Sequence, residues 1–136
     1  IDRSRGLGDV YKRQVPGASS VLDRGFITYS NQAKQEMVGV TAETLAVFGA
    51  VSQQTAEEMA KGGRQTANTD LSISLTGIAG PGGGSAEKPV GLVWISAIRK
   101  DGILQTERHL FTGDRQHIRL LACTHAVSLL LRMSLS

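Results

Sequence analysis

The chain has 136 residues, of which 40% are hydrophobic and 20% charged, values that are typical of one globular domain and exclude general disorder. Its net charge of +3 is concentrated in residues 1–14, which hold four basic and two acidic residues, so the rest of the chain is near neutral and is not expected to bind nucleic acid. The lone cysteine, Cys123, excludes an internal disulfide, and the apolar runs fall short of the roughly 18–20 residues of a membrane span. A cytoplasmic location without a membrane partner is therefore predicted.

Residues 1–14 have the character of a segment that is foreign to the domain. They show neither a helical nor a strand period, and the run GLGDVYKRQ resembles translated sequencing-adapter read-through. A basic, flexible native arm is the alternative interpretation. We therefore expect an adapter-like segment over residues 1–14, and over residues 15–136 a domain that lacks its N-terminal elements.

The first half of the domain predicts one strand and three helices. The strand covers Gly25–Tyr29, which is rich in β-branched and aromatic residues. Two short helices, Asn31–Val38 and Ala42–Phe48, each follow a capping residue and end at a glycine. A third helix begins after Ser52, and its Gly62-Gly63 pair predicts that its last turns fray or end early.

The second half predicts three strands and a long helix. Leu71–Leu75 alternates strictly, Val90–Ile98 is a nearly continuous apolar run, and Leu104–Phe111 follows it after a short turn. The last helix opens at Gly113-Asp114 and reaches about Met133. This order of elements predicts an α/β fold, a single three-layer α/β/α domain with a sheet of mixed direction.

The glycine-rich loop over residues 76–85 is the strongest functional signal. Five of its residues are glycines, which expose backbone N–H groups and permit positive φ, as anion cradles and oxyanion holes require. It matches neither a Walker A loop nor the dinucleotide-binding fingerprint. A plain flexible connection is the alternative, although structureless loops of this length are uncommon inside a compact domain.

Two further positions could carry chemistry. Tyr29 ends the first strand and Lys34 lies in the first turn of the next helix, so both side chains could reach one mouth, where a lysine that loses its proton acts as a base. A solvated surface lysine is the alternative. Arg115, at a helix N-terminus, suits a phosphate or a carboxylate, or is simply solvated. No metal-binding motif is expected from the three histidines, which are His109, His117 and His125.

Five strings together resemble the CinA C-terminal domain, the nicotinamide-nucleotide amidohydrolase family, in order and spacing. They cover residues 25–34, 49–52, 76–85, 87–91 and 113–115. The resemblance extends over Val15–Leu131. It implies a compact α/β/α domain with a mixed sheet, and hydrolysis of the carboxamide of nicotinamide mononucleotide to nicotinate mononucleotide and ammonia, without a metal or cofactor.

The resemblance also implies roles for individual residues. The family's nucleophile is a serine in a Thr-Ala-Glu-Ser-Cys-Thr-Gly-Gly motif, which this sequence lacks, so the chain as given is expected to be inactive. Lys34 matches the family's base and Tyr29 its phenolic partner. The residues implied to bind the oxyanion or the substrate phosphate are Thr76, Gly77, Ile78, Ala79, Gly80, Gly83, Gly84, Ser85 and Arg115.

Two other functions remain open at this point. A non-enzymatic nucleotide- or partner-binding module of a competence- or damage-inducible protein would not need Tyr29 and Lys34 beside the loop. A nucleotide-phosphate sensor would need the loop and Arg115 but not Lys34. Burial of Lys34 at the loop would separate these functions from the amidase. A homo-oligomer is compatible with all three.

Overall fold

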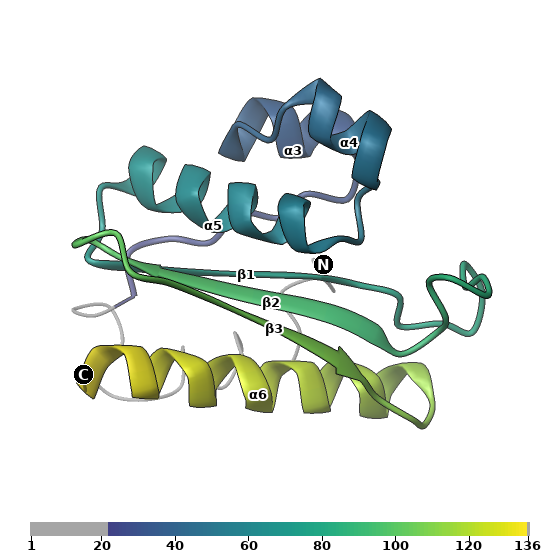
Figure 1. The fold of residues 1–136 in the computed structure, drawn as a ribbon. Helices are drawn as coiled ribbons and strands as arrows, with labels where there is room; N and C mark the ends of the chain where they lie inside the picture. The colour runs from purple at the N-terminus through teal and green to yellow at the C-terminus, as the bar shows by residue number, and fades with distance from the viewer. Residues whose placement is uncertain (1–21, 136) are drawn as a thin grey trace.

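A three-stranded sheet lies between two layers of helices (Figure 1). The computed structural model describes residues 22–135. The strands, in the order in which they lie side by side, are β1 (Leu71–Gly77), β2 (Leu92–Arg99) and β3 (Leu104–Leu110). One face of the sheet is covered by α5, on which α3 and α4 pack in turn, and the other face is covered by α6. The bounds of these helices are α3 Asn31–Val38, α4 Ala42–Phe48, α5 Gln53–Ala67 and α6 Arg115–Leu135.

The three-layer α/β arrangement is confirmed, but the direction of the strands differs from the prediction. Both pairs in the sheet are antiparallel, with Leu71 opposite Arg99 in the first pair and Leu92 opposite Leu110 in the second. A mixed direction is therefore not found within residues 22–135. The β2–β3 hairpin that follows from the sequence is present.

The strand predicted at Gly25–Tyr29 is wrong, since these residues join no ladder. The carbonyl oxygen of Thr28 instead accepts a hydrogen bond from Lys34 Nζ, at 2.7 Å. Phe26 packs against the cluster of the outer helix layer and lies next to Gly63 of α5. Apolar and β-branched residues here belong to an irregular segment that packs under helices. The same residue types are typical of a paired strand, so the sequence pattern does not distinguish the two.

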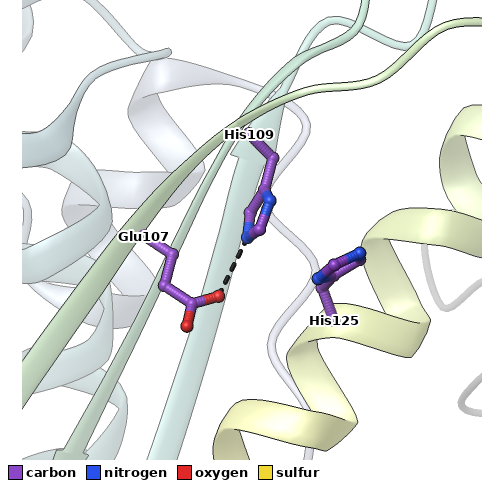
Figure 2. Close-up of side chains that lie close together, drawn as sticks. All are labelled: Glu107, His109 and His125. Atoms are coloured by element: carbon purple, nitrogen blue, oxygen red, sulfur yellow. Dashed lines mark hydrogen bonds and ion pairs between the residues drawn. The ribbon is translucent and has the colours of Figure 1, made fainter.

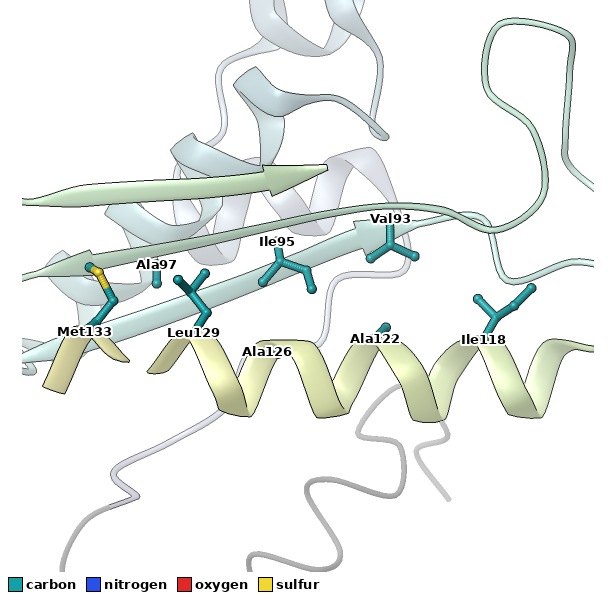
Figure 3. Close-up of a cluster of buried hydrophobic side chains, with 8 residues drawn as sticks. All are labelled: Val93, Ile95, Ala97, Ile118, Ala122, Ala126, Leu129 and Met133. Atoms are coloured by element: carbon teal, nitrogen blue, oxygen red, sulfur yellow. The ribbon is translucent and has the colours of Figure 1, made fainter. Parts of the chain in front are cut away.

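The main core lies between β2 and α6 (Figure 3). Alternate residues of β2 point toward α6, which explains why one face of this long helix is buried. The buried members are Val93, Ile95, Ala97, Ile118, Ala122, Ala126, Leu129 and Met133. Among the described residues, α6 alone is long and apolar enough to cross a membrane, by length and composition, and the core helix of a soluble protein can pass the same test.

The outer helix layer has a smaller core of its own. Val38, Val40 and Leu45 are buried there, and α5 lies close against α3. A Cβ added to Gly62 would stand 1.6 Å from the carbonyl oxygen of Val38, so glycine is what allows the two helices to approach. The prediction that α5 frays near this glycine pair is wrong, because the helix continues to Ala67.

Candidate active site

Lys34 is held at the first turn of α3 by the local fold. Ser30 caps the helix by accepting a hydrogen bond from the N–H of Ala33, at 3.0 Å. Lys34 is only 8% exposed, and its Nζ donates to the carbonyl oxygen of Thr28. Burial lowers the pKa of Lys34 below its ordinary value. A lysine in this setting is more readily deprotonated than one on the surface, which is the property that a general base requires.

Tyr29 lies in a different environment from Lys34. It is 71% exposed and immediately precedes the cap of α3. No hydrogen bond or ion pair joins Tyr29 or Lys34 to residues 76–85 in the part of the chain that the structure describes. The structure thus supports the burial of the lysine, and the joint site of these two side chains with the glycine loop stays a prediction.

The glycine loop is anchored at both ends. Thr76 Oγ1 donates to the carbonyl oxygen of Ala50 at 2.6 Å, which ties the end of β1 to the connection between α4 and α5. The N–H of Ile78 donates to the carbonyl oxygen of Leu92 at 2.9 Å. Gly80 has a φ of +78°, and a Cβ at this position would stand 2.5 Å from Val90. This end of the loop is therefore well fixed.

This anchoring narrows the set of donors that could face an anion. The N–H of Ile78 is already used by Leu92, whereas those of Ala79 and Gly80 have no hydrogen-bond acceptor within residues 22–135. Farther along the loop, residues 82–85 are exposed, and a Cβ at Gly82 would have no neighbour within 4 Å. Ala79 and Gly80 are therefore the candidate oxyanion donors, while the exposed tip suits a larger ligand.

Arg115 lies beside the glycine loop, and its role in binding the substrate phosphate stays a prediction. It opens α6, and its Nη1 donates to the carbonyl oxygen of Gly80 at 3.2 Å. Asp114 caps the same helix, since its Oδ1 accepts from the N–H of His117 at 2.8 Å. Arginine has five N–H donors, so the bond to Gly80 positions a cation beside the loop and leaves donors for a ligand.

A hollow of about 250 Å³ is lined by residues at the start of α5, of strands β2 and β3, and of the segment that follows the glycine loop. Two basic residues line this hollow, Lys88 and Arg108, and neither was predicted from the sequence to have a functional role. Lys88 Nζ donates to the carbonyl oxygen of Phe48 at 2.6 Å. The signals available were the position of Lys88 just after the loop and the strand period that places Arg108 on the α5 face of β3. The lining residues are Val51, Ser52, Gln53, Gln54, Glu87, Lys88, Leu92, Trp94 and Arg108.

Comparison with known proteins identifies the family. A family model described as the CinA C-terminal domain matches residues 6–134. The chain belongs to the CinA C-terminal domain family. A solved member, the competence/damage inducible protein CihA from Agrobacterium tumefaciens, superposes with a TM-score of 0.92 at 43% identity, over 95% of this chain and 79% of that one.

The similar relatives are named in two ways, as nicotinamide-nucleotide amidohydrolases and as competence-damage inducible proteins. Nicotinamide-nucleotide amidohydrolase PncC of Enterobacter agglomerans is 49% identical over 118 residues, which are 87% of this chain and 72% of that protein. PncC of Escherichia coli K12 is 47% identical and is covered over 70% of its length. A relative from Alkaliphilus metalliredigens, whose name describes a competence-damage inducible protein, is 49% identical, but the chain spans only 28% of its length.

Proposed function

We propose that this chain supplies the base and the anion-binding backbone of an amidase, which hydrolyses the carboxamide of nicotinamide mononucleotide to nicotinate mononucleotide and ammonia. The observation that carries the proposal is the burial of Lys34 at the start of α3, because it lowers the pKa of an amine that must accept a proton. The names of the two PncC relatives support the same substrate. A nucleotide substrate is also consistent with Arg115 beside the glycine loop.

In the proposed reaction, a serine Oγ forms a bond to the amide carbon while Lys34 takes the hydroxyl proton. The carbonyl oxygen becomes an oxyanion, and the N–H groups of Ala79 and Gly80 are the proposed donors; one such donor is worth about 3–4 kcal/mol. The C–N bond then breaks, and Lys34 returns the proton to the leaving ammonia. Water then hydrolyses the acyl intermediate. Tyr29 orients or relays the proton that Lys34 accepts. Arg115 binds the substrate phosphate together with the backbone of residues 82–85.

The nucleophile is the part of this scheme that the sequence does not contain. The Thr-Ala-Glu-Ser-Cys-Thr-Gly-Gly motif is absent from the 136 residues. We therefore propose that the 136-residue chain alone does not turn over the substrate. A test of the reaction needs a chimera in which residues 15–136 follow the N-terminal segment of a family member that carries this motif.

The decisive measurement is ammonia release from nicotinamide mononucleotide by this chimera. Lys34→Ala should lower kcat by about 10²–10⁴-fold with little change in KM, because a general base acts in the transition state. Lys61→Ala, which removes an exposed lysine from α5, is the matched control and should leave both constants unchanged. A Lys34→Ala chimera as fast as its parent would remove Lys34 from the mechanism.

Binding of the phosphate is tested separately. Arg115→Ala should chiefly raise KM, because a phosphate contact is present in both the ground state and the transition state. Ammonia release by the unaltered 136-residue chain would show that a nucleophile lies within it. A chimera that binds the nucleotide and releases no ammonia would favour the second candidate, a non-enzymatic binding module.

A further inference from the structure

Three potential metal ligands meet on the face of the sheet that α6 covers (Figure 2). Glu107 and His109 are two apart on β3, so both side chains lie on the same face of that strand. His125 reaches them from α6. One ligand atom from each of the three side chains lies within 4.8 Å of the others. The spacing of the histidines in the sequence shows no metal motif, because the cluster forms only when β3 and α6 pack together.

The contacts around the cluster hold its members in place. His109 Nε2 lies 2.9 Å from Glu107 Oε1, and the rings of His109 and His125 have centroids 4.4 Å apart. Phe111 stacks on His109 with centroids 5.0 Å apart and lies 5.2 Å from His125. Arg132 Nη2 donates to the other carboxylate oxygen, Glu107 Oε2, at 2.7 Å. This last bond leaves Oε1 directed toward the imidazoles, as a supporting hydrogen bond does around a metal ligand.

The exposure and charge of the cluster also suit an ion. The side chains of Glu107 and His109 are 23% and 20% exposed, so an ion can enter from solvent and then lies partly shielded from it. The cluster offers one carboxylate oxygen and two imidazole nitrogens, which are donor types that a divalent transition metal ion binds.

We propose that Glu107, His109 and His125 form a binding site for a divalent first-row transition metal ion of the Zn²⁺ class. One carboxylate oxygen and two imidazole nitrogens are a donor set that Zn²⁺ uses, with a fourth position left for water. In a tetrahedral zinc site, neighbouring ligand atoms stand about 3.3 Å apart, so the side chains must close by about 1.5 Å or less through rotation. The ion takes the place of the proton between Nε2 and Oε1, and that proton moves to Nδ1 or to solvent.

This site is separate from the proposed amidase centre. His125 lies ten residues beyond Arg115 on α6, or about 15 Å along the helix. None of the three ligands belongs to the glycine loop or to the turn that holds Lys34. An ion here joins β3 to α6, so its expected effect is on stability, and the proposal stands or falls independently of the amidase reaction.

The test uses the tag-free 136-residue chain, stripped of metal with a chelator. Co²⁺ titration followed by visible absorption and Zn²⁺ titration calorimetry should both give one equivalent bound, and Zn²⁺ should raise Tm. His109→Ala and His125→Ala should each weaken binding by at least about 10-fold and abolish the shift in Tm. His117→Ala, an exposed histidine on the same helix, is the matched control and should bind as the parent does. Mg²⁺ should not compete, because it prefers oxygen ligands.

Several results would overturn the proposal. They are the absence of a Co²⁺ band, unchanged affinity in His125→Ala, and loss of binding in His117→Ala. If an alanine variant loses its far-ultraviolet circular dichroism spectrum, Glu107→Gln takes its place. This variant keeps a carbonyl that can accept from Arg132 and removes the ligand charge, and binding as tight as in the parent would equally refute the site.

Discussion

The contact of α5 with α3 gives a sharp test of how the outer helix layer is built. In Gly62→Ala, the new Cβ would stand 1.6 Å from the carbonyl oxygen of Val38, where real Cβ contacts essentially never fall below 3.0 Å. The two helices must then separate by about 1.4 Å, which opens the cluster of Val38, Val40 and Leu45. Because the clash is with backbone, rotation of a side chain cannot relieve it.

The size of the effect follows from two opposed terms. Forcing the packed helices apart costs about 3 kcal/mol, at the upper end for overpacking. Replacing glycine by alanine inside a helix returns about 1 kcal/mol. The free energy of unfolding should therefore fall by about 2 kcal/mol, which corresponds to a drop of roughly 6–10 °C in Tm for a domain of this size.

The assay is urea and thermal unfolding followed by circular dichroism, with Gly63→Ala as the control. The new Cβ at position 63 would stand 3.0 Å from the hydroxyl of Ser72, which can rotate away, and in ordinary contact with the ring of Phe26 at 3.8 Å. Both variants gain the same helix propensity, and only Gly62→Ala places its new Cβ against backbone atoms. Gly63→Ala should stay within about 1 kcal/mol of the parent. A Gly62→Ala variant as stable as Gly63→Ala would refute the reasoning.

Three further predictions concern buried polar groups. Ser74→Ala removes the donor to the carbonyl oxygen of Ala56 and should cost about 1 kcal/mol in urea unfolding, and no change would contradict the role of this bond. Between the lowered pKa of Lys34 in the folded chain and its ordinary value of 10.5, the unfolded chain binds more protons than the folded chain. The free energy of unfolding should therefore rise with pH between these two values, and Lys34→Met should flatten the rise. The lowered pKa of Glu107 stabilises the fold above pH 4.5, and this contribution should be lost as the pH falls below that value. In Glu107→Gln, the free energy of unfolding should fall less steeply as the pH is lowered. Equal slopes in parent and variant would contradict either assignment.

Local signals in the sequence were sufficient to predict most of the helices and the hairpin. The hydroxyls of Ser30, Thr41 and Ser52 cap three helices as their positions predict, and Gly39 ends the first of them with a φ of 70°. Such signals act over three or four residues, so they can be recognised without knowing the fold. The apolar run within Val90–Ile98 likewise indicates a strand covered on both faces.

The predictions that were wrong or incomplete all depend on contacts between residues that are far apart in the sequence. The extended residues before α3 look like a strand, yet strand pairing depends on a neighbour that periodicity does not show. Gly62 looks like a weak point of α5 until the carbonyl oxygen of Val38 is seen against it. The same reason hid the Glu107–His109–His125 cluster and the position of Arg108, since each joins elements that are far apart in the sequence.

The stacking of α3 and α4 on α5, with α5 on the sheet, has a consequence for native-state hydrogen exchange. Strand β2 is paired on both edges and packed on both faces, so its amides should exchange only when the whole domain unfolds. The outermost layer is held chiefly by α5, and its amides should exchange through a partial opening of lower free energy. Lys34 belongs to that layer, so its surroundings can become hydrated while the β2–α6 core remains intact.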